Sequence, residues 1–283
     1  PGISMEMKLV PFDSDLWDIY TGAYGSVRTE VKILMGHKKT ASPSGEKLRR
    51  LSAQEKGDYQ IAFDNLCENL WHQTSFYNAL YLVMPYMVTL LEQKESEHDF
   101  DWQLAIISAM GICLASDPGW NEESRLEPGD LLESYRLSVK KLKEKTKVFL
   151  SSHLDQISRL ESRKRGEFLT ALMAILGDRE AAFLLTLSAR EGCPLLCGRC
   201  GFGCENGSLD NPEFRERITP APEKPWDGKS FDDPLTWYSG VLHRVGADAE
   251  ASRLAYYYGT FTCPECGEKK PVLDFMKAYH SFV

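Results

Sequence analysis

The longest apolar run of this 283-residue chain, Ala79 to Val88, lies in a stretch with helical signals, Trp71 to Leu91. Apolar residues recur in this stretch at helical spacing, but tyrosines and further apolar residues fill the other faces too. A helix that is apolar on more than one side must be covered by neighbours on both sides. Stacked pairs of helices provide such cover, because each pair buries its faces against the pairs before and after it.

A short polar corner, His72 to Ser75, separates this apolar pattern from an earlier helical pattern. The side chain of Ser75 can accept hydrogen bonds from the unpaired N–H groups of the helix that follows. We therefore expect a helix–turn–helix, with His72 and Gln73 forming a hydrogen-bonded turn rather than a catalytic site. Pro85 lacks a backbone donor and should kink the second helix.

Apolar periodicity and capping signals predict further helices along the chain. Ser52 to Glu55 has the capping-box pattern, in which the two end residues satisfy N–H groups of the first turn. Gly177 and Asp178 separate two later helices, because glycine favours a helix end and aspartate a helix start. The predicted helices cover residues 15–20, 26–35, 52–70, 76–91, 102–114, 130–151, 154–176, 178–190, 235–245, 247–257 and 272–279.

The composition of the chain changes after Glu191, where cysteine, glycine and proline become frequent. Residues 206–234 hold many turn formers and are expected to form an irregular insertion. We therefore predict an all-α HEAT-like helical-repeat domain over residues 5–190 and a zinc-ribbon-like module with a helical insertion over residues 191–283. Antiparallel helical pairs should form a curved right-handed α-solenoid from about Leu16 to Arg190, with little strand before Cys193.

Two copies of Cys-x-x-Cys-Gly, at 197–201 and 263–267, are the strongest chemical signal of the chain. Two thiolates at this spacing can bind one zinc ion from a tight turn, and two such turns complete a tetrahedron. The gap between the pairs exceeds the usual roughly 15 to 20 residues, so the helices between them would be an insertion within a zinc ribbon. We expect one structural zinc ion, which four sulfur ligands would leave without an open position for water. Its predicted ligands are Cys197, Cys200, Cys263 and Cys266.

Other interpretations of the cysteines remain open. Two disulfides or free thiols are one alternative, although a cytoplasm keeps thiols reduced. A thioredoxin-like redox pair is another, and it would need a strand-to-helix setting. Cys193 and Cys204 flank the first turn and can replace a predicted ligand, although we expect each to be a spare thiol. Cys67 and Cys113 lie in apolar helical patterns and are expected in the core.

The formal net charge of −8 disfavours nucleic acid and favours basic partners. Residues 136–165 differ, with ten basic against three acidic residues, and we interpret them as a solvated helix surface rather than a nucleic-acid site. The apolar run is about half the roughly 20 residues of a membrane-spanning helix, so we expect no membrane span. No secretory signal follows residues 1–4, which resemble a cloning remnant, and a cytoplasmic location is expected.

The motifs of common enzyme classes are not recognisable in this sequence. They include the phosphate-binding glycine loop, the nucleophile elbow, the metalloprotease histidine pair and the dinucleotide fingerprint. Asp232 and Asp233 precede a predicted helix, where carboxylates suit the positive helix end, so we interpret them as helix caps rather than catalytic residues. We therefore expect no enzyme and no catalytic residues.

Three motifs, together with the late cysteine turns, resemble bacterial HEAT-like helical-repeat proteins of about this length. In those relatives a Tyr-Gly motif, a His-Gln-x-x-x-Tyr corner and a Val-Pro-x-Leu-Leu segment recur in this order before a zinc-ribbon-like part. Two departures are the Thr-Ser pair at 74–75, where the family has Gly-Thr, and Met84 in place of the valine before the proline. The corresponding motifs in this chain are Trp17 to Gly25, Trp71 to Tyr77 and Pro85 to Leu91.

The resemblance implies a binding scaffold. Some HEAT-like proteins are immunity proteins that neutralise an interbacterial toxin, and others bind damaged DNA as glycosylases. Because this chain is acidic, we expect a non-enzymatic protein-binding scaffold, in particular an immunity protein bound to a cognate toxin domain, and we do not expect nucleic acid as a partner. The alternatives are a HEAT-like DNA-binding or DNA-repair protein and a zinc-ribbon adaptor.

Overall fold

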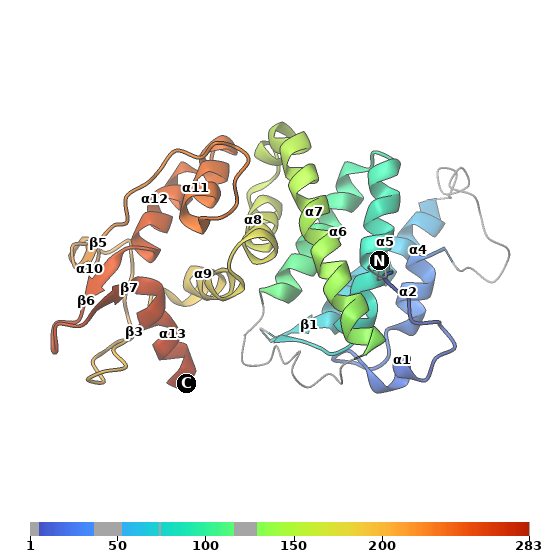
Figure 1. Cartoon of the computed structure of the whole chain (residues 1–283), viewed down its shortest axis with the longest axis horizontal. Helices are drawn as coiled ribbons and strands as arrows, with labels where there is room; N and C mark the ends of the chain where they lie inside the picture. Colours follow the sequence, from blue (N-terminus) through green and yellow to red (C-terminus); the bar gives the residue numbers. More distant parts are fainter. Residues whose placement is uncertain (1–5, 37–52, 74, 116–128, 283) are drawn as a thin grey trace, which may run out of the picture. The chain divides into compact units, whose positions relative to one another are not determined.

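The computed structural model describes residues 6–36, 53–73, 75–115 and 129–282 (Figure 1). The polar, turn-rich residues 38–46, expected to form a loop, and residues 117–119, whose Asp-Pro-Gly is expected to end a helix, lie outside this part. The side chains of the predicted capping box also lie outside it. Within it the chain is predominantly helical, as predicted, with a few short strands. It divides into two compact units, residues 1–149 and 150–283. None of the described helices is both long and apolar enough to cross a membrane.

The helices of the first unit pack in pairs that follow the order of the chain. Helix α2 packs against α4, and α5 packs against α6. Asp99 begins α6, because its carboxylate accepts a hydrogen bond from the backbone N–H of Trp102 at 3.1 Å. Among the described residues, the helices that lie wholly in this unit are α1 (Leu16–Ile19), α2 (Arg28–Leu34), α4 (Ala53–Leu70), α5 (Leu80–Ser96) and α6 (Phe100–Leu114).

Helix α5 forms the centre of the first unit's core. Twelve of its 17 residues are buried, which confirms that neighbours cover it on more than one side. The helix continues through Pro85, and the hydroxyl of Thr89 donates a hydrogen bond to the Pro85 carbonyl at 2.9 Å. The hydroxyl of Tyr86 donates a hydrogen bond to the carbonyl of Val10, which holds the start of the described chain against this helix.

The helix–turn–helix predicted at the polar corner is wrong. The chain there forms a small antiparallel hairpin, β1 (Trp71–His72) with β2 (Ser75–Phe76). Gln73 adopts a left-handed backbone conformation, with φ of 49°, which turns the chain back on itself. Because glutamine rarely adopts this conformation, the sequence does not signal the turn. Helix α5 begins only at Leu80, so Ser75 is a strand residue and does not cap it.

Helix α7 (Asp130–Ser158) runs across the division between the two units and is longer than predicted. The prediction of a separate helix over residues 154–176 is wrong at its start. The backbone departs from helical geometry at His153 but α7 resumes, and α8 (Ser162–Leu176) begins only after Glu161. The carboxylate of Glu161 accepts a hydrogen bond from the first turn of α8, and this local cap sets the boundary that apolar periodicity does not show.

The second unit also contains helices that pack in order, α8 against α9 (Arg179–Glu191) and α11 (Pro234–Arg244) against α12 (Asp248–Tyr257). Asp178 caps α9 as predicted, because its carboxylate accepts hydrogen bonds from the first backbone N–H groups of that helix at 3.0 and 3.2 Å. Capping of α11 by Asp233 is not seen, since its carboxylate makes no hydrogen bond to the backbone of the first turn and instead accepts one from the hydroxyl of Thr236.

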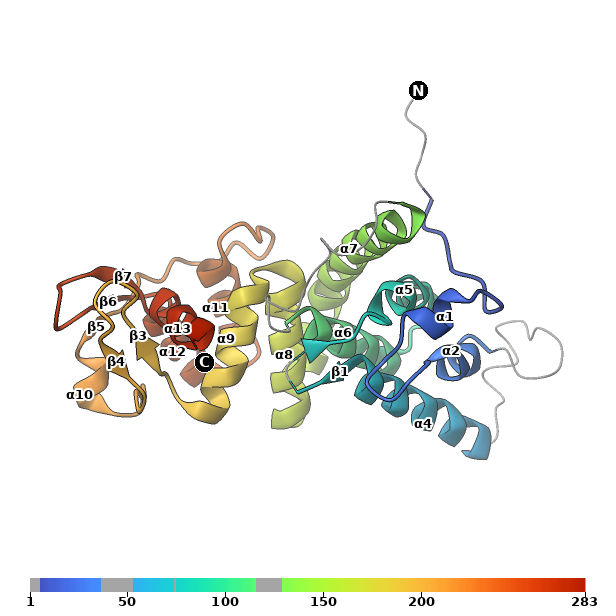
Figure 2. The ribbon, with the colours of Figure 1, turned by 90° about the horizontal axis from the view of Figure 1, so that it is seen from below.

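Short strands and two more helices complete the second unit. Strands β3 and β4 form one hairpin, and β5, β6 and β7 form an antiparallel sheet in that order. Helix α13 packs against β3, as Figure 2 shows. The remaining elements are β3 (Leu195–Leu196), β4 (Gly203–Cys204), α10 (Pro212–Arg215), β5 (Ile218–Thr219), β6 (Thr260–Thr262), β7 (Lys269–Pro271) and α13 (Val272–Phe282).

One hydrophobic cluster joins α9 to the cysteine-rich part of the second unit. It contains Phe183 and Leu187 from α9, Phe261 from β6, and Phe275 and Met276 from α13. The predicted boundary between residues 190 and 191 therefore lies inside a compact unit. The division into a helical-repeat domain over residues 5–190 and a zinc-ribbon-like module over residues 191–283 stays a prediction. A HEAT-like solenoid also stays a prediction, although consecutive described helices do pack in pairs.

Candidate metal centre

The first cysteine turn closes the hairpin of β3 and β4. The N–H of Cys197 donates to the carbonyl of Phe202 at 2.8 Å, and the N–H of Gly201 donates back to the carbonyl of Cys197 at 2.8 Å. Gly201 has φ of +80°, in the left-handed region that favours glycine. This tight turn holds Cys197 and Cys200 at its two ends.

The second cysteine turn has the same hydrogen bonds at the end of β6. The N–H of Cys263 donates to the carbonyl of Glu268 at 2.8 Å, and the N–H of Gly267 donates to the carbonyl of Cys263 at 3.0 Å. Gly267 has φ of +74°, so glycine is required in both turns for the same reason. The two copies of the Cys-x-x-Cys-Gly pattern therefore form turns of the same local geometry.

The two turns bring all four predicted ligands together. The Sγ atoms of Cys197 and Cys266 lie 3.6 Å apart, as do those of Cys200 and Cys263. All four sulfur atoms lie within 4.8 Å of one another, so the group can hold a metal ion. In a tetrahedron with zinc–sulfur bonds of about 2.3 Å, neighbouring sulfur atoms are roughly 3.8 Å apart, which fits this spacing.

The four cysteines differ in their exposure to solvent. Cys197 and Cys263 are each 1% exposed and belong to the hydrophobic cluster of the second unit, whereas Cys200 is exposed and Cys266 is half-buried. The first cysteine of each turn therefore anchors the site in the core. The second cysteine of each turn lies toward the solvent, from which an ion can reach the sulfur atoms.

The thiol pKa values show how the sulfur atoms affect one another. Burial acts to raise the pKa of Cys197, but the N–H groups of Cys200 and Arg199 and the neighbouring thiols lower it to about 7. The N–H of Phe202 acts to lower the pKa of Cys200, but burial and the neighbouring thiols raise it to about 12. One thiolate thus suppresses ionisation of its neighbour, and four thiolates in this space need a cation to offset their repulsion.

An ion-pair network joins the two turns beside the sulfur atoms. The carboxylate of Glu268 lies 3.3 Å from Nη1 of Arg199 and 3.0 Å from Nζ of Lys270. These two cations act to lower the pKa of Glu268, mainly through the hydrogen bond from Lys270. Arg199 and Lys270 are largely exposed, so we expect these pairs to contribute little to stability. Their positive charge offsets part of the negative charge that four thiolates carry.

The other cysteines lie outside the metal-binding group. All eight cysteines are free thiols, and among the described residues the group consists of the four predicted ligands without Cys193 or Cys204. Burial, together with the nearby Cys204, raises the pKa of Cys193 to about 12. Burial raises the pKa of Cys67 to about 12 and also raises that of Cys113. Cys113 lies in the core as expected, whereas Cys67 is half-buried at its edge.

Strand β5 is the part of this centre that the sequence did not indicate. Ile218 and Thr219 pair with Phe261 and Thr260 of β6, immediately before the second cysteine turn. The strand lies in a region rich in turn formers and is only two residues long, so periodicity could not reveal it. It extends the hairpin that carries Cys263 into a three-stranded sheet.

No protein-family model, curated protein or solved structure matches this chain. The grouping of four cysteines that can hold a metal ion therefore rests on the geometry of the chain itself.

Proposed function

We propose that this chain is a non-enzymatic protein-binding scaffold, and in particular an immunity protein that neutralises a cognate bacterial toxin domain by binding it directly. The observation that supports this proposal is the pairing of helices that follow one another in the described chain, α2 with α4 and α5 with α6 in the first unit, and α8 with α9 and α11 with α12 in the second. Stacked helix pairs present extended surfaces for binding other proteins.

The proposed cofactor is one structural zinc ion bound by the four clustered cysteines. Four sulfur ligands fill a tetrahedral shell, so the ion would join the two hairpins and would not activate water. A cytoplasmic location, which we also propose, would keep these thiols reduced and able to bind metal.

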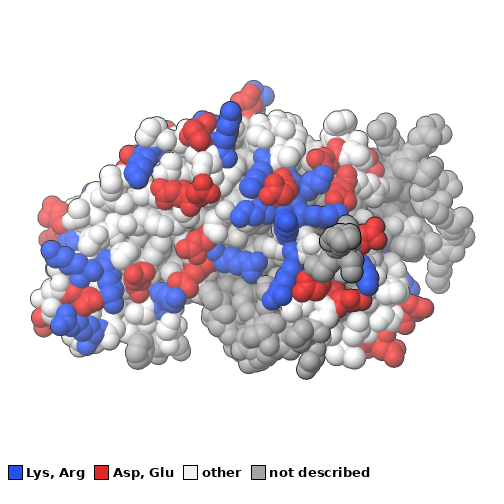
Figure 3. Space-filling model, in the orientation of Figure 1, with Lys and Arg blue, Asp and Glu red and all other residues white. Residues whose placement is uncertain are grey.

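The charges of the chain favour a protein partner over nucleic acid. The net charge is −8, and two of the lysines on α7 pair with α5 of the first unit, Lys141 with Glu92 at 3.3 Å and Lys145 with Glu95 at 2.5 Å. Figure 3 shows Lys and Arg side chains over α7 with Asp and Glu side chains among them. Because part of the positive charge joins two helices, less remains to bind phosphates.

Co-expression with the product of an adjacent toxin gene tests the proposal. We expect this chain to restore growth and to form a stable complex with that toxin, while the mass of the toxin stays unchanged. A toxin of a different class is the control and should not bind. Turnover of a substrate, or binding of duplex DNA at physiological salt, would contradict the proposal.

A further inference from the structure

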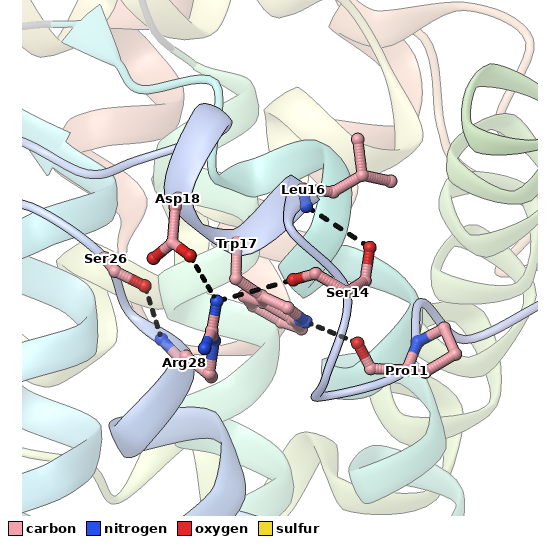
Figure 4. A network of polar contacts seen from close by, with 7 residues as sticks. All are labelled: Pro11, Ser14, Leu16, Trp17, Asp18, Ser26 and Arg28. Atoms are coloured by element: carbon pink, nitrogen blue, oxygen red, sulfur yellow. Dashed lines mark hydrogen bonds and ion pairs between the residues drawn. The ribbon is translucent and has the colours of Figure 1, made fainter.

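The loop between α1 and α2 is closed at its base by a network of polar contacts, which Figure 4 shows. The carboxylate Oδ2 of Asp18 lies 2.7 Å from Nη2 of Arg28, and the same nitrogen donates a hydrogen bond to the carbonyl of Ser14 at 3.4 Å. Trp17 is fully buried, and its indole N–H donates to the carbonyl of Pro11 at 2.9 Å. These contacts hold both ends of the loop formed by residues 20–27.

Two asparagines hold the middle of this loop. Asn69, in the last turn of α4, accepts hydrogen bonds from Ala23 N through its carbonyl and from Tyr24 N through its side chain, both at 2.9 Å. The side chain of Asn78 accepts a hydrogen bond from Thr21 N at 2.9 Å. Because three successive parts of the loop are bonded to the rest of the unit, its backbone has little freedom.

Two glycines allow the loop to lie this close to α4. A Cβ atom at Gly22 would lie 2.7 Å from the carbonyl oxygen of Asn69, so no side chain fits there. Gly25 has φ of +114°, and Gly22 N donates a hydrogen bond to its carbonyl at 2.8 Å. The glycines of the motif at 17–25 are therefore explained by the path of the backbone.

Tyr24 is held in this rigid loop but its side chain is left in solvent. It is 69% exposed, more than any other large hydrophobic residue of the described chain, and Ile19 in the same segment is 63% exposed. Its ring contacts the ring of His72, with ring centroids 5.6 Å apart in an edge-on arrangement. Rigid, exposed tyrosines make effective anchors for protein partners, because little side-chain freedom is lost on binding.

The exposed face of α4, the helix whose last turn is bonded to the Tyr24 loop through Asn69, is acidic. Ile61, Asp64 and Glu68 are exposed and lie on one face of α4, at spacings of three and four residues. Residues 58–72 contain no lysine or arginine. The carboxyl end of α4, to which the loop is bonded, adds the negative end of the helix dipole. A partner that covers this surface must therefore bring positive charge to it.

We propose that Tyr24, Ile61, Asp64 and Glu68, together the Tyr24 surface, bind a basic surface of a protein partner. The ring of Tyr24 contacts a lysine or arginine side chain of the partner through its face, and the two carboxylates pair with neighbouring cations. Ile61, which is 59% exposed, supplies apolar contact area. This inference rests on the proposed function in assuming a protein partner, and it adds where that partner binds and which charge it carries. Nucleic acid would be repelled by the same carboxylates.

Titration of the isotope-labelled full-length protein with a peptide of alternating arginine and glycine tests the surface by nuclear magnetic resonance. We expect saturable shifts of the amides of residues 21–25 and 61–72, weakened by salt. Tyr24→Ala and Glu68→Lys should each lower the affinity by about tenfold or more, whereas Tyr24→Phe should retain it. Val148→Ala removes an exposed apolar residue elsewhere in the first unit and should leave the affinity unchanged.

A peptide of alternating glutamate and glycine, and a short DNA duplex, serve as the matched probes of opposite charge. Neither should shift the amides of the Tyr24 surface. Absence of saturable shifts with the arginine peptide, or shifts that Tyr24→Ala leaves unchanged, would overturn the inference. Shifts of these amides by the duplex would overturn it in favour of nucleic acid.

The same variants separate this inference from the proposed function. If the adjacent toxin binds and neither Tyr24→Ala nor Glu68→Lys weakens the complex, the Tyr24 surface is not the binding site, although the immunity function stands. If no toxin binds but the arginine peptide binds in a manner that depends on Tyr24, the immunity function is wrong, whereas the Tyr24 surface still binds basic partners.

Discussion

The Sγ atom of Cys200 lies 3.6 Å from that of Cys263, although the two residues belong to different hairpins and are 63 positions apart in the chain. Each hairpin forms its turn through local hydrogen bonds, but the approach of the two turns depends on the packing of the segments between and after them. Cys263 and Phe261 share one hydrophobic cluster with α9 and α13. The centre therefore couples a local motif to the core of the second unit.

Purified protein should contain about one zinc ion per chain, and Cys263→Ser should lose most of it, because a three-sulfur site binds zinc more weakly. Metal analysis and the charge-transfer absorption of the cobalt-substituted protein measure this. Cys204→Ser is the control, since Cys204 lies outside the ligand group. Metal loss in Cys204→Ser, or full retention in Cys263→Ser, would show that the ligand set is different.

Removal of the metal by a chelator should loosen the cysteine turns before it affects the first unit. Without a cation, the four sulfur atoms no longer hold the hairpins together. Hydrogen exchange should therefore accelerate at residues 195–204 and 260–271, while α5 and α6 keep their protection. Equal acceleration in α5 would contradict a local structural role for the metal.

Gly267→Ala should weaken metal binding and destabilise the second unit by about 1 to 2 kcal/mol, because alanine resists the left-handed conformation of this turn. Gly198→Ala is the matched control. No neighbouring atom lies near either added Cβ, but only Gly267 has a positive φ, of +74°. Chemical denaturation measures the stability of both variants, and zinc titration measures their metal affinity. Equal effects of the two substitutions would argue against backbone conformation as the cause.

Asp178→Ala should lower the free energy of unfolding by about 1 kcal/mol, because the start of α9 loses a side chain that accepts two backbone hydrogen bonds. Asp155→Ala removes an exposed aspartate within α7 and should change stability by less than about 0.5 kcal/mol. Urea denaturation compares the two variants. A larger loss from Asp155→Ala would mean that charge, rather than capping, determines the result.

Stability should fall above about pH 10, the ordinary pKa of tyrosine. Burial raises the pKa values of Tyr238 and Tyr258, so the folded chain keeps these protons while the unfolded chain releases them. The stabilising contribution is complete below pH 10 and is lost as the pH rises through the folded pKa, by up to about 1.4 kcal/mol per pH unit for each group. Denaturation at several alkaline pH values measures this slope.

Replacing each of these tyrosines with phenylalanine should change stability differently near neutral pH. Tyr238 donates a hydrogen bond to the carbonyl of Leu169 at 2.9 Å, so Tyr238→Phe should destabilise by about 1 kcal/mol. The buried hydroxyl of Tyr258 has no hydrogen-bond partner among the described residues, so Tyr258→Phe should be neutral or stabilising. Both variants should reduce the alkaline slope, and a steep slope in the double variant would exclude these residues as its source.

The sequence by itself determined the elements that depend on neighbouring residues. Apolar spacing indicated that α5 is covered on several sides. Gly177 and Asp178 indicated the break before α9, because helix caps act within one turn. The cysteine turns were predictable for the same reason. Two thiols and a glycine at fixed spacing define a turn, and two such turns define the four possible metal ligands.

Only the tertiary structure decided how distant or weakly signalled segments combine. The left-handed Gln73 turned an expected helical corner into a hairpin, the two-residue β5 completed the sheet beside Cys263, and the cluster with α9 joined the cysteine-rich part to the preceding helices. The position of Tyr24, outside the core but in a loop held by Asn69, also depends on contacts 45 positions apart. Such contacts arise from long-range packing and hydrogen bonding, which local spacing along the chain does not encode.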